Sequence, residues 1–424
     1  MTGITAPMPS TSALNHTAAR PSPQPRPRVR IFNVKYSPNL GDGLLSECLE
    51  QALVECGADE STCSIDLAAR SAYGRGTAGR SALMRMLQSL PPALRRLAVR
   101  LPLAVQSRRR WLPHYRAALR DADCVVIGGG NLIADLDLNF PTKLALAIHE
   151  SADRGLPVFI YGCGVSSGWS RQGAALLQQA LARDAVRQVF LRDERSISLW
   201  HDLFGEHAGL PARLVRDPGL LAGERYGLGA SQPRPGAVLV GLNVTAPVAV
   251  QYHAEHAPQA RQLEDWYLNL AETLVARGFR VAVFTNGSPE DRACAARLRS
   301  AFETIALPGQ VSFPEADTPG ELARLISGLG GLIAFRMHAI IASYACRIPF
   351  VALDWDPKLA SFVHSIDHSE WLVDPASTPP ETAASLLAQA MANGIAPNTH
   401  ARVIAQARYG VESLHTEIAR AVKP

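Results

Sequence analysis

Short runs of aliphatic and β-branched residues alternate with stretches of helical period from Val29 onward. Each run is followed by Gly, Asn, Asp or Arg rather than by a hairpin turn, which is typical of a mostly parallel sheet covered by helices. In the first half this pattern predicts strands at 29–34, 124–127, 158–161, 188–191 and 213–215, and helices at 44–55, 174–181 and 194–203.

The pattern breaks at residues 222–236, where Gly, Ser and Pro recur without an apolar period, and then starts again. The second half predicts strands at 238–244, 279–285, 332–335 and 350–353, and helices at 262–277, 291–302, 321–329 and 339–346.

Two repeats of one alternation predict an α/β protein with two Rossmann-like domains, at 29–221 and 237–375, joined by a linker at 222–236. Ligands of open α/β sheets bind beyond the carboxyl ends of the strands, and in a tandem pair these ends can face each other across a cleft. Further helices are expected between 376 and 424, at 383–391 and 401–422, but their period does not show where they dock.

Composition adds expectations about environment. Residues 1–28 are rich in Pro, Ser, Thr and Ala and lack the apolar core of an export signal, so we expect a disordered tail. The seven cysteines never form a C-x-x-C pair, which favours free thiols in a reducing compartment. No run of 18 apolar residues exists, so we expect a cytoplasmic protein, and nothing in the composition requires a metal or a cofactor.

The first candidate loop is Asn39-Leu-Gly-Asp42, between a predicted strand and a predicted helix. Gly41 permits a tight turn, and Asn39 or Asp42 is suited to cap the helix. Free N–H groups at a helix start favour a bound anion, although a capped helix without a ligand explains the same residues.

Glycines follow the next two strands. Gly129, Gly130 and Asn131 stand directly after 124–127, and Gly164 lies in the loop that follows 158–161. Glycines let the backbone approach a ligand closely. Neither loop meets the G-x-G-x-x-G pattern, so NAD binding has little support.

Charged residues follow four further strands. Arg192 and Arg336 are expected at the ligand-binding edges of the two sheets, where a guanidinium pairs well with carboxylate or phosphate. His338 lies two residues after Arg336 at a helix start, and is either structural or a proton-transfer group. Lys358 offers a third positive charge, whereas Asp217 followed by proline also fits a plain turn.

Two pairs of glutamates eight residues apart, Glu47 with Glu55 and Glu264 with Glu272, lie on predicted helices. This spacing places each pair on one helical face, which we interpret as a solvated face rather than as catalytic carboxylates.

Taken in chain order, these loops resemble the polysaccharide pyruvyl transferase family. The resemblance covers residues 29–362 and is carried by Asn39-Leu-Gly-Asp42, Gly128–Gly130, Gly162–Gly164, Arg192-Asp193 with Ser196, Asp217-Pro218, Arg336-x-His338-x-x-Ile341, and Asp356-Pro-Lys358. The sequence departs from the family at Arg347, where glycine is common, and in a long basic insertion before Asp121.

The resemblance implies a glycosyltransferase-B-like arrangement and transfer of pyruvate from phosphoenolpyruvate, as a ketal, onto two hydroxyls of a sugar in a cell-surface polysaccharide or exopolysaccharide. Such a donor carries a carboxylate and a phosphate, so we expect Arg192 and Arg336 to bind it as bidentate clamps, with Lys358 as a third positive charge. We expect His338 to be the general acid and base, because imidazole titrates near neutral pH. A nucleotide-sugar glycosyltransferase of the same architecture and a non-catalytic assembly scaffold remain alternatives.

Residues 70–120 contain twelve arginines and no acidic residue, so the net charge of +4 comes from this segment. Its arginines alternate with leucines and Trp111, a pattern that fits peripheral docking on an anionic membrane carrying a lipid-linked sugar acceptor. A helical insertion packed on the first domain, with solvated or paired arginines, explains the same pattern. The segment lacks a nucleic-acid-binding motif, so we expect no nucleic acid partner.

Overall fold

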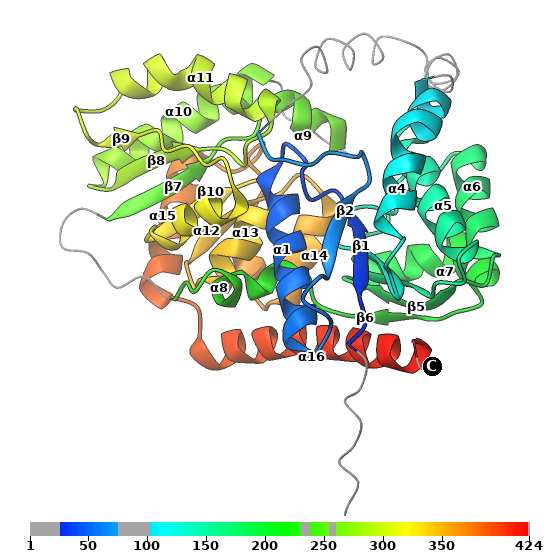
Figure 1. The fold of residues 1–424 in the computed structure, drawn as a ribbon. Helices are drawn as coiled ribbons and strands as arrows, with labels where there is room; N and C mark the ends of the chain where they lie inside the picture. The colour runs from blue at the N-terminus through cyan, green and yellow to red at the C-terminus, as the bar shows by residue number, and fades with distance from the viewer. Residues whose placement is uncertain (1–25, 75–101, 230–237, 254–259, 423–424) are drawn as a thin grey trace, which may run out of the picture.

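The computed structural model describes residues 26–74, 102–229, 238–253 and 260–422. Two six-stranded parallel sheets, each flanked by helices, form two domains side by side (Figure 1). Strand order is β2-β1-β3-β4-β5-β6 in the first sheet and β12-β11-β10-β7-β8-β9 in the second. The predicted α/β class with two Rossmann-like domains is confirmed, while residues 1–25 of the expected tail, 75–101 of the basic segment and 230–236 of the linker lie outside the described residues.

The first domain contains every strand and helix that its pattern predicts. Its strands are β1 (Val29–Asn33), β2 (Cys63–Asp66), β3 (Cys124–Gly128), β4 (Val158–Cys163), β5 (Val186–Leu191) and β6 (Ala212–Leu214). Its helices include α1 (Leu40–Glu55), α4 (Leu112–Ala118), α5 (Asn139–Ala152), α6 (Arg171–Leu181) and α7 (Glu194–Ala208), with a π-helical turn η1 (Ser107–Trp111) before α4. Strand β2 and helices α4 and α5 are additions to the prediction.

The second domain repeats the alternation. Its strands are β7 (Leu239–Asn243), β8 (Arg280–Phe284), β9 (Val311–Ser312), β10 (Gly331–Ala334), β11 (Phe350–Leu353) and β12 (Leu372–Val373). Its helices are α9 (Pro247–His253), α10 (Ala260–Ala276), α11 (Pro289–Thr304), α12 (Pro319–Ser327), α13 (Met337–Ala345), α14 (Pro357–Ser365) and α15 (Pro380–Asn393). Helices α11, α12 and α14 each start with proline after a capping Ser, Thr or Asp, a combination that satisfies free N–H groups at the first turn.

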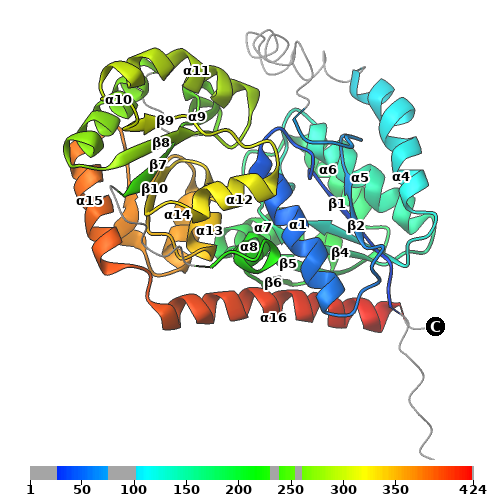
Figure 2. The ribbon, with the colours of Figure 1, turned by 60° about the vertical axis from the view of Figure 1, so that its left-hand side comes forward.

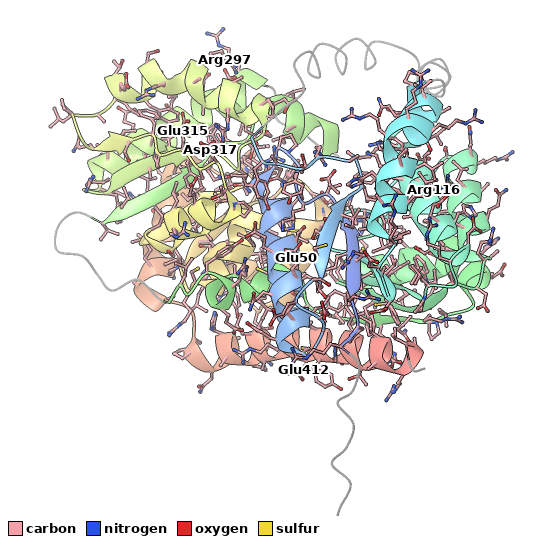
Figure 3. All side chains as sticks on the ribbon, in the orientation of Figure 1. Glu50, Arg116, Arg297, Glu315, Asp317 and Glu412 are labelled. Atoms are coloured by element: carbon pink, nitrogen blue, oxygen red, sulfur yellow. The ribbon has the colours of Figure 1, made fainter. Side chains whose placement is uncertain are left out.

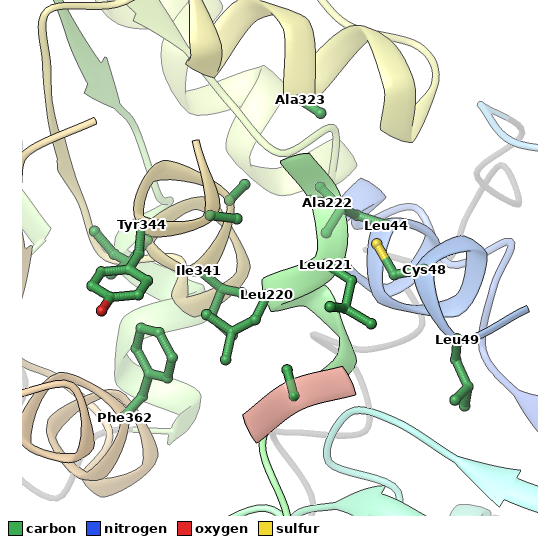
Figure 4. Close-up of a cluster of buried hydrophobic side chains, with 14 of the residues drawn as sticks. Leu44, Cys48, Leu49, Leu220, Leu221, Ala222, Ala323, Ile341, Tyr344 and Phe362 are labelled. Atoms are coloured by element: carbon green, nitrogen blue, oxygen red, sulfur yellow. The ribbon is translucent and has the colours of Figure 1, made fainter. Parts of the chain in front are cut away.

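Helix α1 stands between the two sheets and joins them through apolar contacts (Figure 1). Its Leu44 and Cys48 belong to one buried cluster with Leu220 of η2 (Pro218–Leu221), Ala222 of α8 (Ala222–Arg225) and Ile341 of α13 (Figure 4). The predicted linker therefore begins as a helix, because Ala222 is fully buried in the core that the two domains share.

One end-of-element expectation is wrong, and one departure from the family pattern leaves the local backbone geometry intact. Arg28, assigned to the disordered tail, is part of the fold, since its guanidinium binds both carboxylate oxygens of Asp123 at 3.1 and 2.9 Å. Arg347 retains the expected helix-end geometry without glycine: its φ is +57°, and Ile348 N–H donates to the Ser343 carbonyl at 2.8 Å. All seven cysteines are free thiols, and five of them are buried.

The last helix, α16 (Pro397–Ala421), runs beneath both domains (Figure 2). It packs on α1, on η2 and on β4, which answers the docking question that its period left open. Gly410 permits the close approach, because a Cβ there would lie 2.8 Å from the Tyr161 hydroxyl oxygen and 3.4 Å from Val215. Arg216 adds two hydrogen bonds to Gln406 Oε1, at 3.1 and 3.0 Å.

We predict that Gly410→Val lowers the free energy of unfolding by about 1–3 kcal/mol, because overpacking forces α16 away from the sheet. Urea denaturation measures the change. The neighbouring Tyr409 is 70% exposed, so Tyr409→Val is the matched control and should stay within about 0.5 kcal/mol of the parent protein. Equal effects of both substitutions would contradict the packing argument.

Candidate functional site

The start of helix α1 meets the second domain at His338. Asn39 caps the helix, accepting from Gly41 N–H at 3.2 Å, and Leu40 N–H donates to the Asn286 carbonyl of the second domain at 2.8 Å. A Cβ at Gly41 would lie 2.5 Å from His338 Cβ and 2.9 Å from its Nδ1. Only glycine fits at this position, so the imidazole packs directly on the α1 backbone.

His338 is 9% exposed and presents two different nitrogens. Its Nδ1 lies 3.8 Å from Asp42 Oδ1, whereas Nε2 is buried without a hydrogen-bond partner among the described residues. Burial lowers the pKa of His338; the Asp217 and Asp42 carboxylates oppose this effect, and the Arg192 and Arg336 guanidinium groups add to it. The imidazole is therefore neutral near pH 7, within reach of four charged side chains.

Arg192 follows β5 and is almost fully enclosed, with its side chain 5% exposed. Its nearest carboxylate oxygens are long contacts, at 3.5 Å to Asp217 and 3.6 Å to Asp193, and its Nε has no hydrogen-bond partner among the described residues. Gly164 lines the same space, because a Cβ there would lie 2.7 Å from Arg192 Nη2. A buried guanidinium with a free donor is suited to bind an anion.

Arg336 caps α13 but turns toward its own domain. Its Nε and Nη2 both donate to Asp291 Oδ2, at 3.0 and 2.6 Å. Asp291 is fully buried and also accepts from Ala246 N–H at 2.8 Å. Two N–H groups of Arg336 that were expected to bind a substrate therefore donate to a carboxylate of the protein itself.

Lys358 stands in the first turn of α14 and is 12% exposed. Its Nζ lies 3.5 Å from Asp356 Oδ2, the capping residue of the same helix. Burial lowers the pKa of Lys358, and the positive charges of Arg192 and Arg195 lower it further against the opposing Asp356. Arg192 of the first domain and Lys358 of the second therefore lie close enough to repel each other.

The loops that contain Gly129, Gly130 and Gly164 lie next to the Arg192 side chain. Gly129 and Gly130 adopt φ values of +80° and +72°, and Gly130 accepts from Gly164 N–H at 2.8 Å. Asn131 donates from Nδ2 to Ser166 Oγ at 3.0 Å, so its amide joins the two loops. The structure thus brings the neutral imidazole of His338 together with the charged side chains of Arg192, Arg336, Asp42 and Lys358. The glycines and Asn131 belong to the loops next to Arg192.

Asp217 is the residue whose role the sequence understated. Its Oδ1 accepts from Gly219 N–H at 2.9 Å, as a plain turn requires, but its Oδ2 faces Arg192 and its charge raises the pKa of His338. The signal was available, because Asp217 follows a strand of the same sheet as Arg192. Asp291 was missed because it lies inside a predicted helix.

The interpretation of Glu47 as a solvated residue is wrong. Its side chain is 15% exposed, and both of its carboxylate oxygens accept from tyrosine hydroxyls, of Tyr73 at 2.8 Å and Tyr226 at 2.9 Å. Both tyrosines come from segments far from Glu47 in sequence, which helical spacing cannot reveal.

Within the described part of the chain, no helix is long and apolar enough to cross a membrane. The same residues contain no group of three or more His, Cys, Asp or Glu arranged to hold a metal ion.

The polysaccharide pyruvyl transferase family model matches residues 39–357. This chain belongs to the polysaccharide pyruvyl transferase family. The match begins at Asn39 and ends one residue before Lys358, so it spans both domains and nearly every charged residue of the site. Family membership makes the protein a transferase of polysaccharide biosynthesis. No curated protein matches the chain.

Several solved structures are similar to this chain. A putative UDP-N-acetylglucosamine 2-epimerase from Listeria monocytogenes aligns with a TM-score of 0.52 at 9% identity, over 92% of this chain and 95% of that one. A UDP-GlcNAc 2-epimerase from Neisseria meningitidis bound to UDP-GlcNAc gives 0.48 at 10% identity, over 93% and 98%. A glycosyltransferase from Rickettsia africae gives 0.46 at 9% identity, over 93% and 96%. The likeness to the first structure confirms the glycosyltransferase-B-like arrangement.

Proposed function

We propose that this family member transfers pyruvate from phosphoenolpyruvate onto two hydroxyls of a sugar, forming a cyclic ketal. The observation that carries the proposal is that two buried atoms, Arg192 Nε of the first domain and His338 Nε2 of the second, have no hydrogen-bond partner among the described residues, while their side chains interact electrostatically. Phosphoenolpyruvate carries a carboxylate and a phosphate, and both groups pair well with guanidinium and ammonium.

Arg192 and Lys358 are the principal donor-binding cations in this proposal. Their protein partners are 3.5 Å or more away, so an incoming phosphate or carboxylate oxygen competes successfully for them. Arg336 contributes positive charge while Asp291 holds its fork. Because these side chains expose only 5–14% of their surface, we infer that the domains separate to admit the donor.

The proposed reaction has two balanced steps. The C2=C3 bond of phosphoenolpyruvate gains a proton at C3 while a sugar hydroxyl attacks C2 and gives up its proton. The C2–O bond to phosphate then breaks, and a second hydroxyl closes the ketal and loses its proton to the departing phosphate or to a base. The products are the ketal and inorganic phosphate, and no cofactor is consumed.

His338 fits the role of base better than that of initial acid, because its lowered pKa leaves Nε2 free to accept a hydroxyl proton at neutral pH. Once protonated, the same nitrogen can return the proton. Asp42 is the positioning residue: facing Nδ1 at 3.8 Å, its carboxylate favours the tautomer that carries hydrogen on Nδ1.

Calorimetric titration with phosphoenolpyruvate tests the donor site. We expect saturable binding that Arg192→Ala weakens about tenfold or more, the loss of one or two charge-assisted hydrogen bonds. Arg187→Ala removes an exposed arginine from β5, the strand that precedes Arg192, and is the matched control. Binding of UDP-N-acetylglucosamine in place of phosphoenolpyruvate would favour the glycosyltransferase alternative, and equal donor affinity in Arg192→Ala would remove this residue from the site.

The histidine assignment predicts a titration. The imidazole of His338, followed by NMR and identified by its loss in His338→Gln, should have a pKa below the ordinary 6.5 because burial disfavours the cation. Asp42→Asn should lower this pKa further, since the Asp42 carboxylate raises it, and the acid limb of turnover should move to lower pH with it. Asp153→Asn, at an exposed position, should change neither. A pKa that rises in Asp42→Asn would contradict the assignment.

We also propose that the basic segment 70–120 docks on an anionic membrane carrying a lipid-linked acceptor. In the described part of this segment, Arg70 forms an ion pair with Asp66, and Arg116 forms one with Glu150 (Figure 3 labels Arg116 on α4). Trp111 is buried, so the residues around it pack on the first domain. Arg108, Arg109 and Arg110 are exposed in one helical turn and carry the docking proposal.

Cosedimentation with phosphatidylglycerol vesicles at low salt should retain the protein, and phosphatidylcholine vesicles should not. Replacing Arg108, Arg109 and Arg110 together by alanine should weaken retention, as each basic residue near such a surface contributes about 1 kcal/mol. Equal sedimentation of parent and triple variant would mean that this turn is only a solvated part of the insertion.

A further inference from the structure

A cavity opens beside the middle of α1, and its lining does not include the charged residues around His338. Its volume is about 440 Å³, within the range of small-ligand sites. The first domain, helix α8 and helix α12 all contribute to its wall, through Glu47, Tyr73, Arg225, Tyr226, Gly320 and Arg324. A ligand bound here would therefore contact both domains at once.

Glu47 organises the aromatic part of this wall. Its Oε1 accepts from the Tyr73 hydroxyl and its Oε2 from the Tyr226 hydroxyl. Burial and the nearby carboxylate raise the pKa of both phenols, so both remain neutral donors. The carboxylate is thus occupied in holding two rings, and the rings are fixed in place before any ligand arrives.

Positive charge remains on the wall after these contacts. Arg225 Nη2 is 3.9 Å from Glu47 Oε2, a long contact, and its side chain is 35% exposed. Arg324 is exposed, and no carboxylate among the described residues lies within ion-pair distance of it. Gly320 stands between the two kinds of group, since a Cβ there would lie 3.3 Å from the Tyr226 ring and 3.6 Å from Arg324 Nη1.

We propose that this cavity binds an acidic saccharide unit, one that carries a carboxylate on a sugar ring. Fixed tyrosine rings offer a flat apolar face with a polar edge, which suits the C–H face and hydroxyls of a pyranose. The two guanidinium groups supply the charge that a carboxylate needs, and an arginine fork matches its geometry.

Helix α1 contributes both to the cavity, through Glu47, and to the surroundings of His338, through Asp42. Gly43, next to Asp42, packs against Tyr73 and Pro319, where a Cβ would be 2.7 Å from each. Glu47 follows five residues after Asp42, about 7.5 Å along the helix axis. As a subsite for the unit that flanks the reacting sugar, the cavity rests on the proposed function; as a saccharide site it stands on its own residues.

Saturation-transfer NMR on the full chain tests the proposal with digalacturonate as the probe and cellobiose as the neutral control. We expect signal from digalacturonate only, declining with added salt because the contact is ionic. Arg324→Ala should weaken binding about tenfold, while Arg280→Ala, which removes an exposed arginine that does not line the cavity, should leave it unchanged.

Three results would overturn the inference: equal binding of cellobiose, equal competition by the simple dicarboxylate glutarate, or unchanged digalacturonate affinity in Arg324→Ala. Titration of Arg324→Ala with phosphoenolpyruvate separates this inference from the proposed function. Retained donor binding with lost saccharide binding supports the subsite, whereas saccharide binding without any donor binding supports the cavity and removes the proposed donor.

Discussion

Contact between the α1 backbone at Gly41 and the imidazole of His338 ties the two domains together at the site. No Cβ fits between them, and the Leu40 N–H bond to Asn286 holds the same junction from the other side. The position of His338, which belongs to the second domain, is thus set by the first. A change in the angle between the domains would therefore change the surroundings of this histidine.

The ion pairs around that contact differ in the distance between their charged groups. Arg336 is held by Asp291 at hydrogen-bond distance, whereas Arg192 has only long contacts with Asp217 and Asp193. Enclosing a charge in protein is costly unless a partner compensates for the lost water, so the tight pair is mainly structural. The loosely compensated Arg192 gains most from an added anion, and it comes from the domain opposite to Lys358. An anion that reaches both cations would favour the closed arrangement of the domains.

The spacing of apolar residues along the chain was sufficient to predict most of the strands and helices. The strands β3, β4 and β10 are buried at every position and are mostly apolar in sequence, as strands covered on both faces usually are. Strand β2 lies at the sheet edge, and its Cys-Ser-Ile-Asp sequence is half polar, so no apolar run marked it. Arg192, Arg336, His338 and Lys358 could be selected because each follows a strand. The hydrogen-bond partners of such residues could not be predicted, because they are far away in the sequence and meet only in the folded chain. Asp291 is 45 residues from Arg336, and Tyr226 is 179 residues from Glu47.

Helix α16 belongs to neither Rossmann repeat, yet it touches α13 of the second domain and η2, α1 and β4 of the first. This helix packs on both domains, on the side opposite to the start of α1, and so links them mechanically. Movements that slide one domain past the other must break its contacts, while a rotation that pivots near the helix leaves them in place. The contacts of the C-terminal helix therefore oppose sliding of the domains and are compatible with a rotation that separates them near Gly41 and His338.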